Sequence, residues 1–309
     1  MKINKIPFLY DQDWIEHQVF HSKFNGYDLI EDFTIKDSNI IFPLMVFKSN
    51  STLQKTALQN GFFTLTPLLL NRDDYNSRKY VKLINKKTNE VLPLIKDAAL
   101  DSFYIQQFPG LTFRKPFTSY SEISKKTILR GRNLVDLALD FDSLWSHVRP
   151  RYRSSINKVE EVEFYFGDIP DNVFNNLVHR HFELAGRKTK PDICWEILKS
   201  FVKNKKAFIC KYQNDFLYFM FSEDYSYYSI SCAEKNKKNV THILMWNAIK
   251  FAKKQGSTLM DLGVYYPGEI CENPLTWSEK EDFKKIKQIS NFKNGFASHI
   301  YPDFYDKII

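Results

Sequence analysis

The chain has 309 residues, of which 43% are apolar and 16% aromatic, and this apolar content excludes a disordered chain. Its formal net charge of +8 at pH 7 allows an anionic partner, such as a nucleotide, a phosphorylated substrate, RNA or a membrane surface. The four cysteines stand singly without CxxC spacing, which argues for reduced, mostly buried thiols and against a disulfide framework or a zinc site.

The sequence of the amino terminus and the length of the apolar runs indicate where in the cell the protein is located. The first residues, MKINKIPFLYDQDW, lack the apolar region of a signal peptide. No run approaches the roughly 18 uninterrupted apolar residues of a membrane-spanning helix. We therefore expect a cytoplasmic protein with no integral membrane segment.

The length favours two domains, because one hydrophobic core rarely serves more than about 250–300 residues. In the first part, short apolar runs at Ile40–Phe47 and Phe62–Leu70 alternate with polar turns and predict strands with a few helices. Asn133–Leu139 predicts a strand that opens a new unit. We place an N-terminal lobe at 1–132 and a second domain at 133–309.

The second domain opens with local helix and strand signals. Phe141–Val148 predicts a helix that ends before Pro150, and a basic segment, RPRYRSSINK, follows it. Val162–Phe166 alternates apolar and polar side chains and predicts a strand.

Two helices are predicted next. Asp171 can cap the first, and Gly186 suits the left-handed position after its end. Pro191 and Asp192 start the second. The apolar positions at helical spacing are Phe174, Leu177, Val178 and Phe182 in the first helix and Ile197, Leu198, Phe201 and Val202 in the second.

Three strands then follow in close succession and predict an antiparallel meander: Ala207–Tyr212, Phe216–Phe221 and Tyr225–Cys232. Thr241–Lys254 predicts a helix that ends at Gly256, and Thr258–Val264 predicts a further strand. A strand–helix–strand crossover of this length pairs its strands in parallel. The predicted order is β-α-α-β-β-β-α-β.

This order resembles the core of the GNAT acyltransferases. In that core the last strand of the meander and the strand after the crossover splay apart, so their free backbone groups can pair with an extended pantetheine arm. The resemblance also implies that the helix from Thr241 directs its free N–H groups at the pyrophosphate of the donor.

Two stretches look like the Fem-like branch of this superfamily. The first, HILMWNAIKFAKKQGSTLMDLGVYYPGE, runs a crossover helix into a strand with DLG, and the second, SEKEDFKKIKQISNFKNGFASHIYP, contains the Fem-like I-x-x-F-K-x-G-F at Ile289–Phe296. AGRKT…W (Ala185–Trp195) with SEKE (Ser278–Glu281) resembles Fem-like transferases from bacterial surface-sugar gene neighbourhoods. The resemblance covers about residues 140–305.

The fold expected from this resemblance is α+β, with two GNAT-like lobes of which the first is degenerate. Its sheet is mixed and mostly antiparallel, with one parallel strand–helix–strand crossover and a splayed strand pair. One feature departs from the family pattern: acetyl-CoA enzymes carry a glycine-bearing pyrophosphate loop, whereas Glu234–Val240 (EKNKKNV) contains no glycine. This leaves two donors open, acetyl-CoA or another acyl-CoA and aminoacyl-tRNA.

Lys293 and Asp261 are the catalytic candidates. The resemblance implies that Lys293 stabilises the oxyanion at the reacting carbonyl, with Phe292 beside it. Asp261 lies on the strand after the crossover, where it can orient or deprotonate an attacking amine, or can be hydrogen-bonded structurally.

The remaining candidates are binding residues. Arg187, between the two helices, and Arg151 and Arg153, in the basic segment, suit an anionic acceptor, and Phe292 and Tyr265 complete the substrate set. Asn239, Thr241 and His242 open the crossover helix and are expected at the cofactor, with Thr241 as the helix cap. Lys293 and Arg187 are expected to face one cleft. His179 and His181 face different ways on their helix, and we expect no metal.

The function expected is direct acyl transfer without a covalent enzyme intermediate. The preferred reaction is N-acetyl transfer from acetyl-CoA to an amino sugar or sugar nucleotide in cell-surface polysaccharide biosynthesis. One alternative is a Fem-type transferase that delivers an aminoacyl group from tRNA to a peptidoglycan precursor. A second alternative is a non-catalytic binding module on the same fold.

Overall fold

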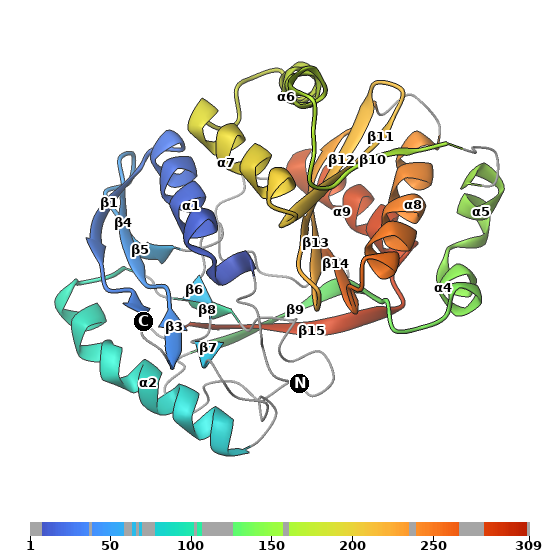
Figure 1. The fold of residues 1–309 in the computed structure, drawn as a ribbon. Helices are drawn as coiled ribbons and strands as arrows, with labels where there is room; N and C mark the ends of the chain where they lie inside the picture. The colour runs from blue at the N-terminus through green and yellow to red at the C-terminus, as the bar shows by residue number, and fades with distance from the viewer. Residues whose placement is uncertain are drawn as a thin grey trace. The chain divides into compact units, whose positions relative to one another are not determined.

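The computed structural model describes residues 8–36, 39–58, 64–65, 68–69, 78–101, 104–106, 126–156, 161–234, 239–265 and 281–307. These residues form two compact units (Figure 1). The first runs to Arg130 and takes in the end of the chain from Pro302, and the second holds the described residues from Gly131 to Tyr301. The second unit thus begins two residues before the expected Asn133.

The first unit contains small sheets and two long helices. One antiparallel sheet has the order β1-β4-β5 and another the order β2-β3-β7, while β8 pairs with β6 in parallel and with β15. Pro43 falls between the strands predicted as one run at Ile40–Phe47. The elements are η1 (Phe8–Tyr10), α1 (Gln12–Phe24), β1 (Tyr27–Asp32), β2 (Ile35–Lys36), β3 (Ile40–Phe42), β4 (Met45–Ser49), β5 (Lys55–Leu58), β6 (Thr64–Leu65), β7 (Leu68–Leu69), α2 (Arg78–Asp97) and β8 (Tyr104–Gln106).

The second unit follows the predicted order closely. Its elements are β9 (Lys126–Asp136), α4 (Phe141–His147), α5 (Pro150–Ile156), β10 (Glu163–Tyr165), α6 (Asp171–Ala185), α7 (Asp192–Lys203), β11 (Ala207–Tyr212), β12 (Asp215–Phe221), β13 (Ser226–Cys232), α8 (Val240–Lys254), β14 (Leu259–Tyr265), α9 (Glu281–Asn294) and β15 (His299–Lys307). The strands β9 and β15 each pass along the chain from one unit into the other.

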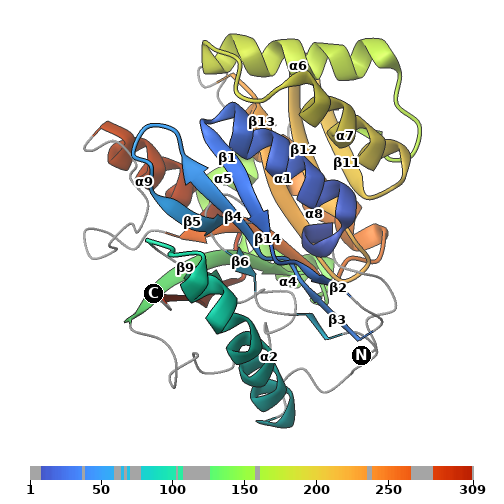
Figure 2. The same cartoon turned by 90° about the vertical axis from the view of Figure 1, so that its left-hand side faces the viewer.

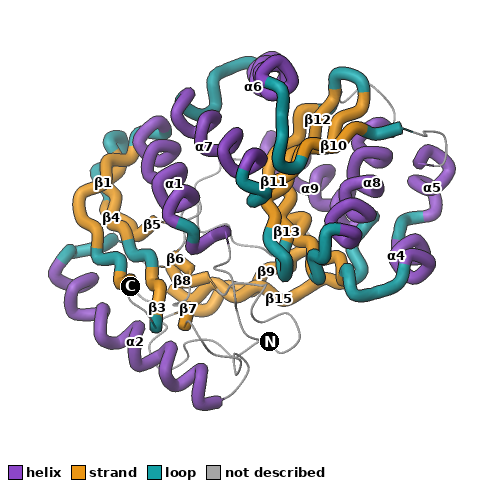
Figure 3. Tube along the Cα trace, in the orientation of Figure 1, coloured by secondary structure: helices purple, strands orange, loops and turns teal. Residues whose placement is uncertain are grey.

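The basic segment after Pro150, to which the sequence analysis assigned no element, forms the helix α5 (Figure 3). Pro150 is the first residue of this helix, where a missing N–H costs no hydrogen bond and the fixed φ angle fits. The segment around Lys293, for which the sequence predicted no helix, is the C-terminal part of α9.

The sheet of the second unit has the order β10-β11-β12-β13-β14-β9. All its neighbours are antiparallel except β13 and β14, which are parallel and are joined through α8. The predicted meander and single parallel crossover are therefore confirmed.

Helices cover both faces of this sheet. α6 packs against β12 and β13 and α7 against β11, whereas α8 packs on the opposite face against β11 and β12 (Figures 1 and 2). The side chains of Phe208, Leu217 and Phe219 lie on the face that contacts α8. Tyr218 lies on the face that contacts α7, and its hydroxyl donates to Leu198 O. These residues form each face because strand side chains alternate.

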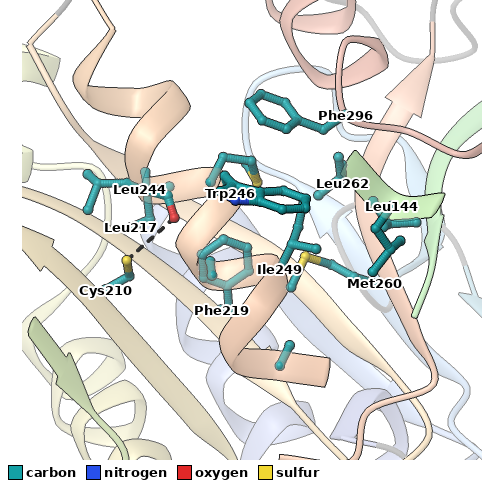
Figure 4. Packing of buried hydrophobic residues seen from close by; sticks show 14 of the residues in the cluster. Leu144, Cys210, Leu217, Phe219, Leu244, Trp246, Ile249, Met260, Leu262 and Phe296 are labelled. Carbon is teal, nitrogen blue, oxygen red and sulfur yellow. Dashed lines mark hydrogen bonds between the residues drawn. The ribbon is translucent and has the colours of Figure 1, made fainter. Parts of the chain in front are cut away.

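The core around α8 is apolar and closely packed (Figure 4). Leu244, Ala248 and Ile249 of α8 are buried against the sheet, and full burial of a side chain such as leucine contributes about 1.5–3 kcal/mol. Cys210 Sγ, which is buried, lies 3.5 Å from Leu244 O. Like Cys194 and Cys232 it is a free, buried thiol, as predicted.

Candidate active site

The strands β13 and β14 are paired with each other at two positions only. Ser226 is opposite Met260 and Tyr227 is opposite Asp261, yet β13 continues to Cys232 and β14 to Tyr265. The two strands therefore part beyond Tyr227 and Asp261. We call the space between these parting ends the splay.

Both strands carry a bulge where they part. On β14, Leu262 and Gly263 together oppose Asn133 of β9, and on β13 the extra residue is Ser229. A bulge bends its strand and increases the local twist. Gly263 has a φ of +94°, which a glycine adopts at little cost. The bulges give a physical reason for the splay.

Asn133 stabilises the bulge of β14 from the neighbouring strand. Its side chain is fully buried, and its Nδ2 lies 3.3 Å from the carbonyl oxygens of both Gly263 and Val264. These contacts provide hydrogen-bond donors for carbonyl groups that the bulge removes from the regular strand pairing.

Asp261 is the centre of a buried hydrogen-bond cluster. Its Oδ2 accepts from Arg132 Nε at 2.8 Å, from Arg132 Nη2 at 2.6 Å and from the Tyr225 hydroxyl at 2.5 Å. Its Oδ1 accepts from the backbone N–H of Gly263 at 2.6 Å. Both carboxylate oxygens are thus engaged, which favours the structural one of the two roles that the sequence left open for Asp261.

Lys293 reaches the splay from α9, which packs against β14. Its Nζ lies 2.8 Å from the point that a Cβ on Gly263 would occupy and 5.4 Å from the centre of the Tyr228 ring. Burial lowers the pKa of Lys293 to about 8, against the opposing effect of the Asp261 charge, and Arg132 lowers it further. The ammonium therefore lies where β13 and β14 part, against one residue of each strand.

A pocket of about 470 Å³ opens beside α9. Three helices contribute to it: α5, the start of α8, and α9. Its lining consists of Arg151, Tyr152, Asn239, His242, Gln288, Asn291 and Phe292. Four of these, Arg151, Asn239, His242 and Phe292, were predicted as binding residues from the sequence.

Aromatic rings form much of this pocket. The Tyr152 ring lies 4.1 Å from the His242 ring, which lies 5.2 Å from Phe292, and the Arg151 guanidinium lies 5.4 Å from the centre of Tyr152. Burial lowers the pKa of His242, and the charges of Arg151 and Arg149 lower it further. The positive charge of the pocket lining at neutral pH therefore comes from Arg151, and His242 contributes a neutral ring.

Solved structures resemble the whole chain. FemX superimposes with a TM-score of 0.54 at 12% identity over 98% of this chain and 94% of its own. L-PGS from Bacillus licheniformis gives a TM-score of 0.59 at 13% identity, covering 100% and 94% of the two chains. The C-terminal domain of a putative lysylphosphatidylglycerol synthetase from Agrobacterium fabrum gives 0.56 at 11% identity, covering 98% and 90%.

This chain has the Fem-like GNAT fold. No family profile matches the sequence, and no curated protein is similar to it at a significant level. The Fem-like fold is thus established by topology and by structural similarity.

Several predicted residues lie apart from the splay and the pocket of this Fem-like fold. Arg187 is exposed in the turn after α6, and α6 covers the face of the sheet opposite α8. Lys293 approaches Tyr228, whose ring packs with the core beneath α8. The structure therefore does not bring Arg187 and Lys293 to one face of the sheet, and the expected common cleft is not supported.

The side chain of Arg153 forms its hydrogen bonds with nearby residues of the preceding helix, α4, and its end. Its Nε donates to Val148 O at 2.8 Å and its Nη2 to Ser146 O at 2.6 Å, while its guanidinium stacks on Trp145. These contacts satisfy carbonyl groups at the end of α4. The structure thus gives Arg153 a local role, in contrast to the neighbouring Arg151.

Two further candidates lie at element ends. The expectation that Thr241 caps α8 is wrong, since the cap position is Asn239, in a left-handed conformation with φ +84° and without a side-chain cap bond. Thr241 lies in the first turn and is half-buried. Tyr265 ends β14, and its ring covers Gly131 so closely that a Cβ there would lie 2.8 Å from Tyr265 Cδ1.

Arg132, Asn133 and Tyr225 are the site residues that the sequence analysis missed. Arg132 and Asn133 immediately precede the apolar run of β9, so polar side chains that enter a predicted buried strand were the available signal. Their partners lie about 130 positions away in the sequence, at Asp261, Gly263 and Val264. Among the described residues no group of three or more His, Cys, Asp or Glu side chains is placed to hold a metal ion.

Within the described part of the chain, every helix is too short or too polar to cross a membrane.

Proposed function

We propose that this protein is an acyltransferase that transfers an acyl group directly from an activated ester or thioester to a nucleophile, with the reacting carbonyl in the splay. The observation that carries this proposal is the Lys293 ammonium between the parting ends of β13 and β14. Unpaired strand edges can hold an extended donor arm by backbone hydrogen bonds. A cation beside them can stabilise the charge that develops on the carbonyl oxygen.

The proposed chemistry needs few side chains. The acceptor amine or hydroxyl forms a bond to the carbonyl carbon, and the oxyanion of the tetrahedral intermediate is stabilised by Lys293. The carbon–sulfur or carbon–oxygen bond to the donor then breaks, and the leaving group takes up the proton that the acceptor loses. Asp261 does not take this proton in the proposal, because both its oxygens are engaged.

The pocket suits the adenosine phosphate that both donor classes contain. Aromatic faces at Tyr152 and Phe292 can stack on a base, and Arg151 can bind a phosphate. Acyl-CoA and aminoacyl-tRNA both carry this group. The preferred reaction remains N-acetyl transfer from acetyl-CoA to an amino sugar or sugar nucleotide for a cell-surface polysaccharide.

A second candidate is aminoacyl transfer from tRNA to a peptidoglycan precursor or another envelope acceptor. Two observations favour it: the loop before α8 lacks glycine, and two of the similar structures are FemX and a putative lysylphosphatidylglycerol synthetase. The name of the latter refers to an aminoacyl ester of a lipid, which is an envelope component.

Donor binding distinguishes the two reactions. Calorimetry with acetyl-CoA and filter retention of aminoacyl-tRNA are to be compared in the wild type and in Arg151→Met. Arg187→Met is the matched control, because it removes the same charge from an exposed position on the other face of the sheet. We expect Arg151→Met alone to weaken binding of the true donor.

Turnover completes the test. Release of free CoA with a panel of amino sugars supports the first reaction, and transfer of labelled amino acid from tRNA to an envelope precursor supports the second. Absence of binding of both donors at low salt would exclude the proposed function and favour the non-catalytic binding module.

A further inference from the structure

Arg132 and Asp261 form an ion pair that the proposed chemistry does not use. Arg132 is 6% exposed and Asp261 0% exposed. Burial of two charges costs several kcal/mol of desolvation for each ion, so apolar residues at these positions would often serve stability equally well. The pair lies at the edge of the splay, which suggests that the ion pair has a functional role there.

A continuous set of contacts joins Arg132 to the ammonium of Lys293. Arg132 holds Asp261 Oδ2 through two N–H groups. Asp261 Oδ1 in turn holds the N–H of Gly263, which has a left-handed φ. The space where a side chain of residue 263 would begin is taken by Lys293 Nζ. Three elements, β9, β14 and α9, are thereby connected.

We propose that Arg132 is a positioning residue for Lys293. By holding Asp261, it fixes the bulge at Gly263 and so the place of the ammonium in the splay. By balancing the charge of Asp261, it also prevents Asp261 from capturing the ammonium in an ion pair. That this placement of Lys293 serves catalysis rests on the proposed function. The placement of Lys293 by Arg132 does not depend on that function.

The charges that face Lys293 support the second part of this proposal. Asp261 on β14 attracts the ammonium, Arg132 on β9 repels it, and the Tyr228 ring on β13 lies beside it. Lys293 forms no salt bridge with any residue in the described ranges. The pKa of Lys293 is accordingly lowered by burial more than Asp261 raises it.

Labelling of Lys293 tests the proposal without any donor or acceptor. Acetic anhydride acylates only the neutral amine, so the labelling rate of each lysine follows its ionisation across about pH 6–11, the range that brackets lysine pKa values in folded proteins. Peptide mass spectrometry reads Lys293 in the full chain, with the salt-bridged Lys199 as internal reference. The variants are Arg132→Met, Arg132→Lys and Asp261→Asn, and circular dichroism verifies that each is folded.

Opposite changes in the labelling midpoint are expected. Asp261→Asn removes the carboxylate charge that raises the pKa of Lys293 and should lower the midpoint of Lys293 labelling below that of the wild type. Arg132→Met leaves Asp261 unbalanced and should raise it, which slows labelling near neutral pH about tenfold for every pH unit by which the midpoint rises. Arg132→Lys keeps the charge and should restore most of the wild-type midpoint. Arg180→Met removes ion pairs that involve Asp215 and Glu234, and it should leave Lys293 unchanged.

Opposite changes in Asp261→Asn and Arg132→Met, with rescue by Arg132→Lys, support the positioning role. If Arg132→Met does not fold, a lowered midpoint in Asp261→Asn together with a wild-type midpoint in Arg132→Lys still supports it. Equal midpoints in all folded variants, or a Lys293 that is never labelled in the folded wild type, overturn it. If labelling behaves as expected and no acyl transfer is found, only the proposed function fails.

Discussion

The surroundings of a single lysine are formed here by residues of two different strands, β13 and β14. The ammonium of Lys293 lies over a residue without a side chain, Gly263, and beside an aromatic ring, Tyr228. Burial lowers its pKa to about 8, while the negative charge of Asp261 opposes this effect. At neutral pH the lysine is therefore charged and able to stabilise an oxyanion.

Lys293→Met tests this role directly. Loss of one oxyanion-stabilising group typically costs about 2.7–4 kcal/mol of barrier, so turnover should fall about a hundredfold or more while the fold is retained. In the wild type, kcat/KM should decline as pH rises through about 8, because the charged form is lost. The measurement is the pH profile of acyl transfer, and a profile that rises through this pH would assign Lys293 to a base instead.

Stability should also depend on the ionisation of Lys293. Its folded pKa of about 8 lies below the roughly 10.4 of an unfolded lysine. Between these values the unfolded chain binds more protons, so the free energy of unfolding rises with pH, and below about 8 this gain is absent. Urea unfolding at several pH values should show this rise in the wild type, and Lys293→Met should lack it.

Gly263→Ala should displace the ammonium. A Cβ at this position would lie 2.8 Å from Lys293 Nζ, and the φ of +94° adds backbone strain of about 1–3 kcal/mol. Because Nζ is the end of a flexible side chain, we expect Lys293 to move out and the fold to survive with reduced stability. Unfolding by urea measures the first effect and labelling of Lys293 the second. Wild-type labelling in Gly263→Ala would contradict the packing described above.

At the scale of elements, Gly295, which directly follows α9, packs very closely against Tyr152 of α5. A Cβ on Gly295 would lie within 3.0 Å of three atoms of the Tyr152 ring, and Gly295 O accepts from Arg149 N at 2.8 Å. The same ring borders the pocket. The contact with Gly295 therefore helps to fix a ring that lines the pocket.

Two glycine variants separate steric from backbone effects. Gly295→Ala should cost about 1–3 kcal/mol, because it overpacks the contact with Tyr152, and it should also weaken donor binding. Gly186→Ala, where a Cβ would meet nothing within 4 Å and φ is +67°, should cost only about 1–2 kcal/mol of backbone strain. Thermal unfolding compares their stabilities, and calorimetry should show normal donor binding in Gly186→Ala.

The elements also differ in how far the sequence predicts them. β11 agrees with its prediction in both bounds, and α8 and β14 agree within one residue, because each combines strong periodicity with a clear Gly or polar turn at its end. The helix α5 has few apolar residues, and its proline, which in the sequence indicates the end of the preceding helix, is the first residue of α5. The sequence identified Lys293 as a candidate from a motif, but Arg132 and Asn133 become part of the site only through pairing of β9 with β14.

The whole molecule is basic, with a formal net charge of +8. If the donor is aminoacyl-tRNA, binding should weaken steeply as salt rises, because counterions are released from each neutralised phosphate. Arg151→Met should reduce the slope of log affinity against log salt by about one, whereas Arg187→Met should leave it unchanged. Filter retention across a salt series gives both slopes. Identical slopes in Arg151→Met and the wild type would show that Arg151 in the pocket does not bind a phosphate of the tRNA.

One helix, α9, carries both Phe292 of the pocket and Lys293 of the splay. Occupation of the pocket and protonation of the lysine are consequently two binding equilibria that involve one helix. Any ligand that shifts α9 changes the proton affinity of Lys293, and thermodynamic reciprocity requires that pH change the affinity for that ligand by the same factor. If the pocket binds the proposed donor, the affinity of the protein for that donor would therefore depend on pH even before any reaction takes place.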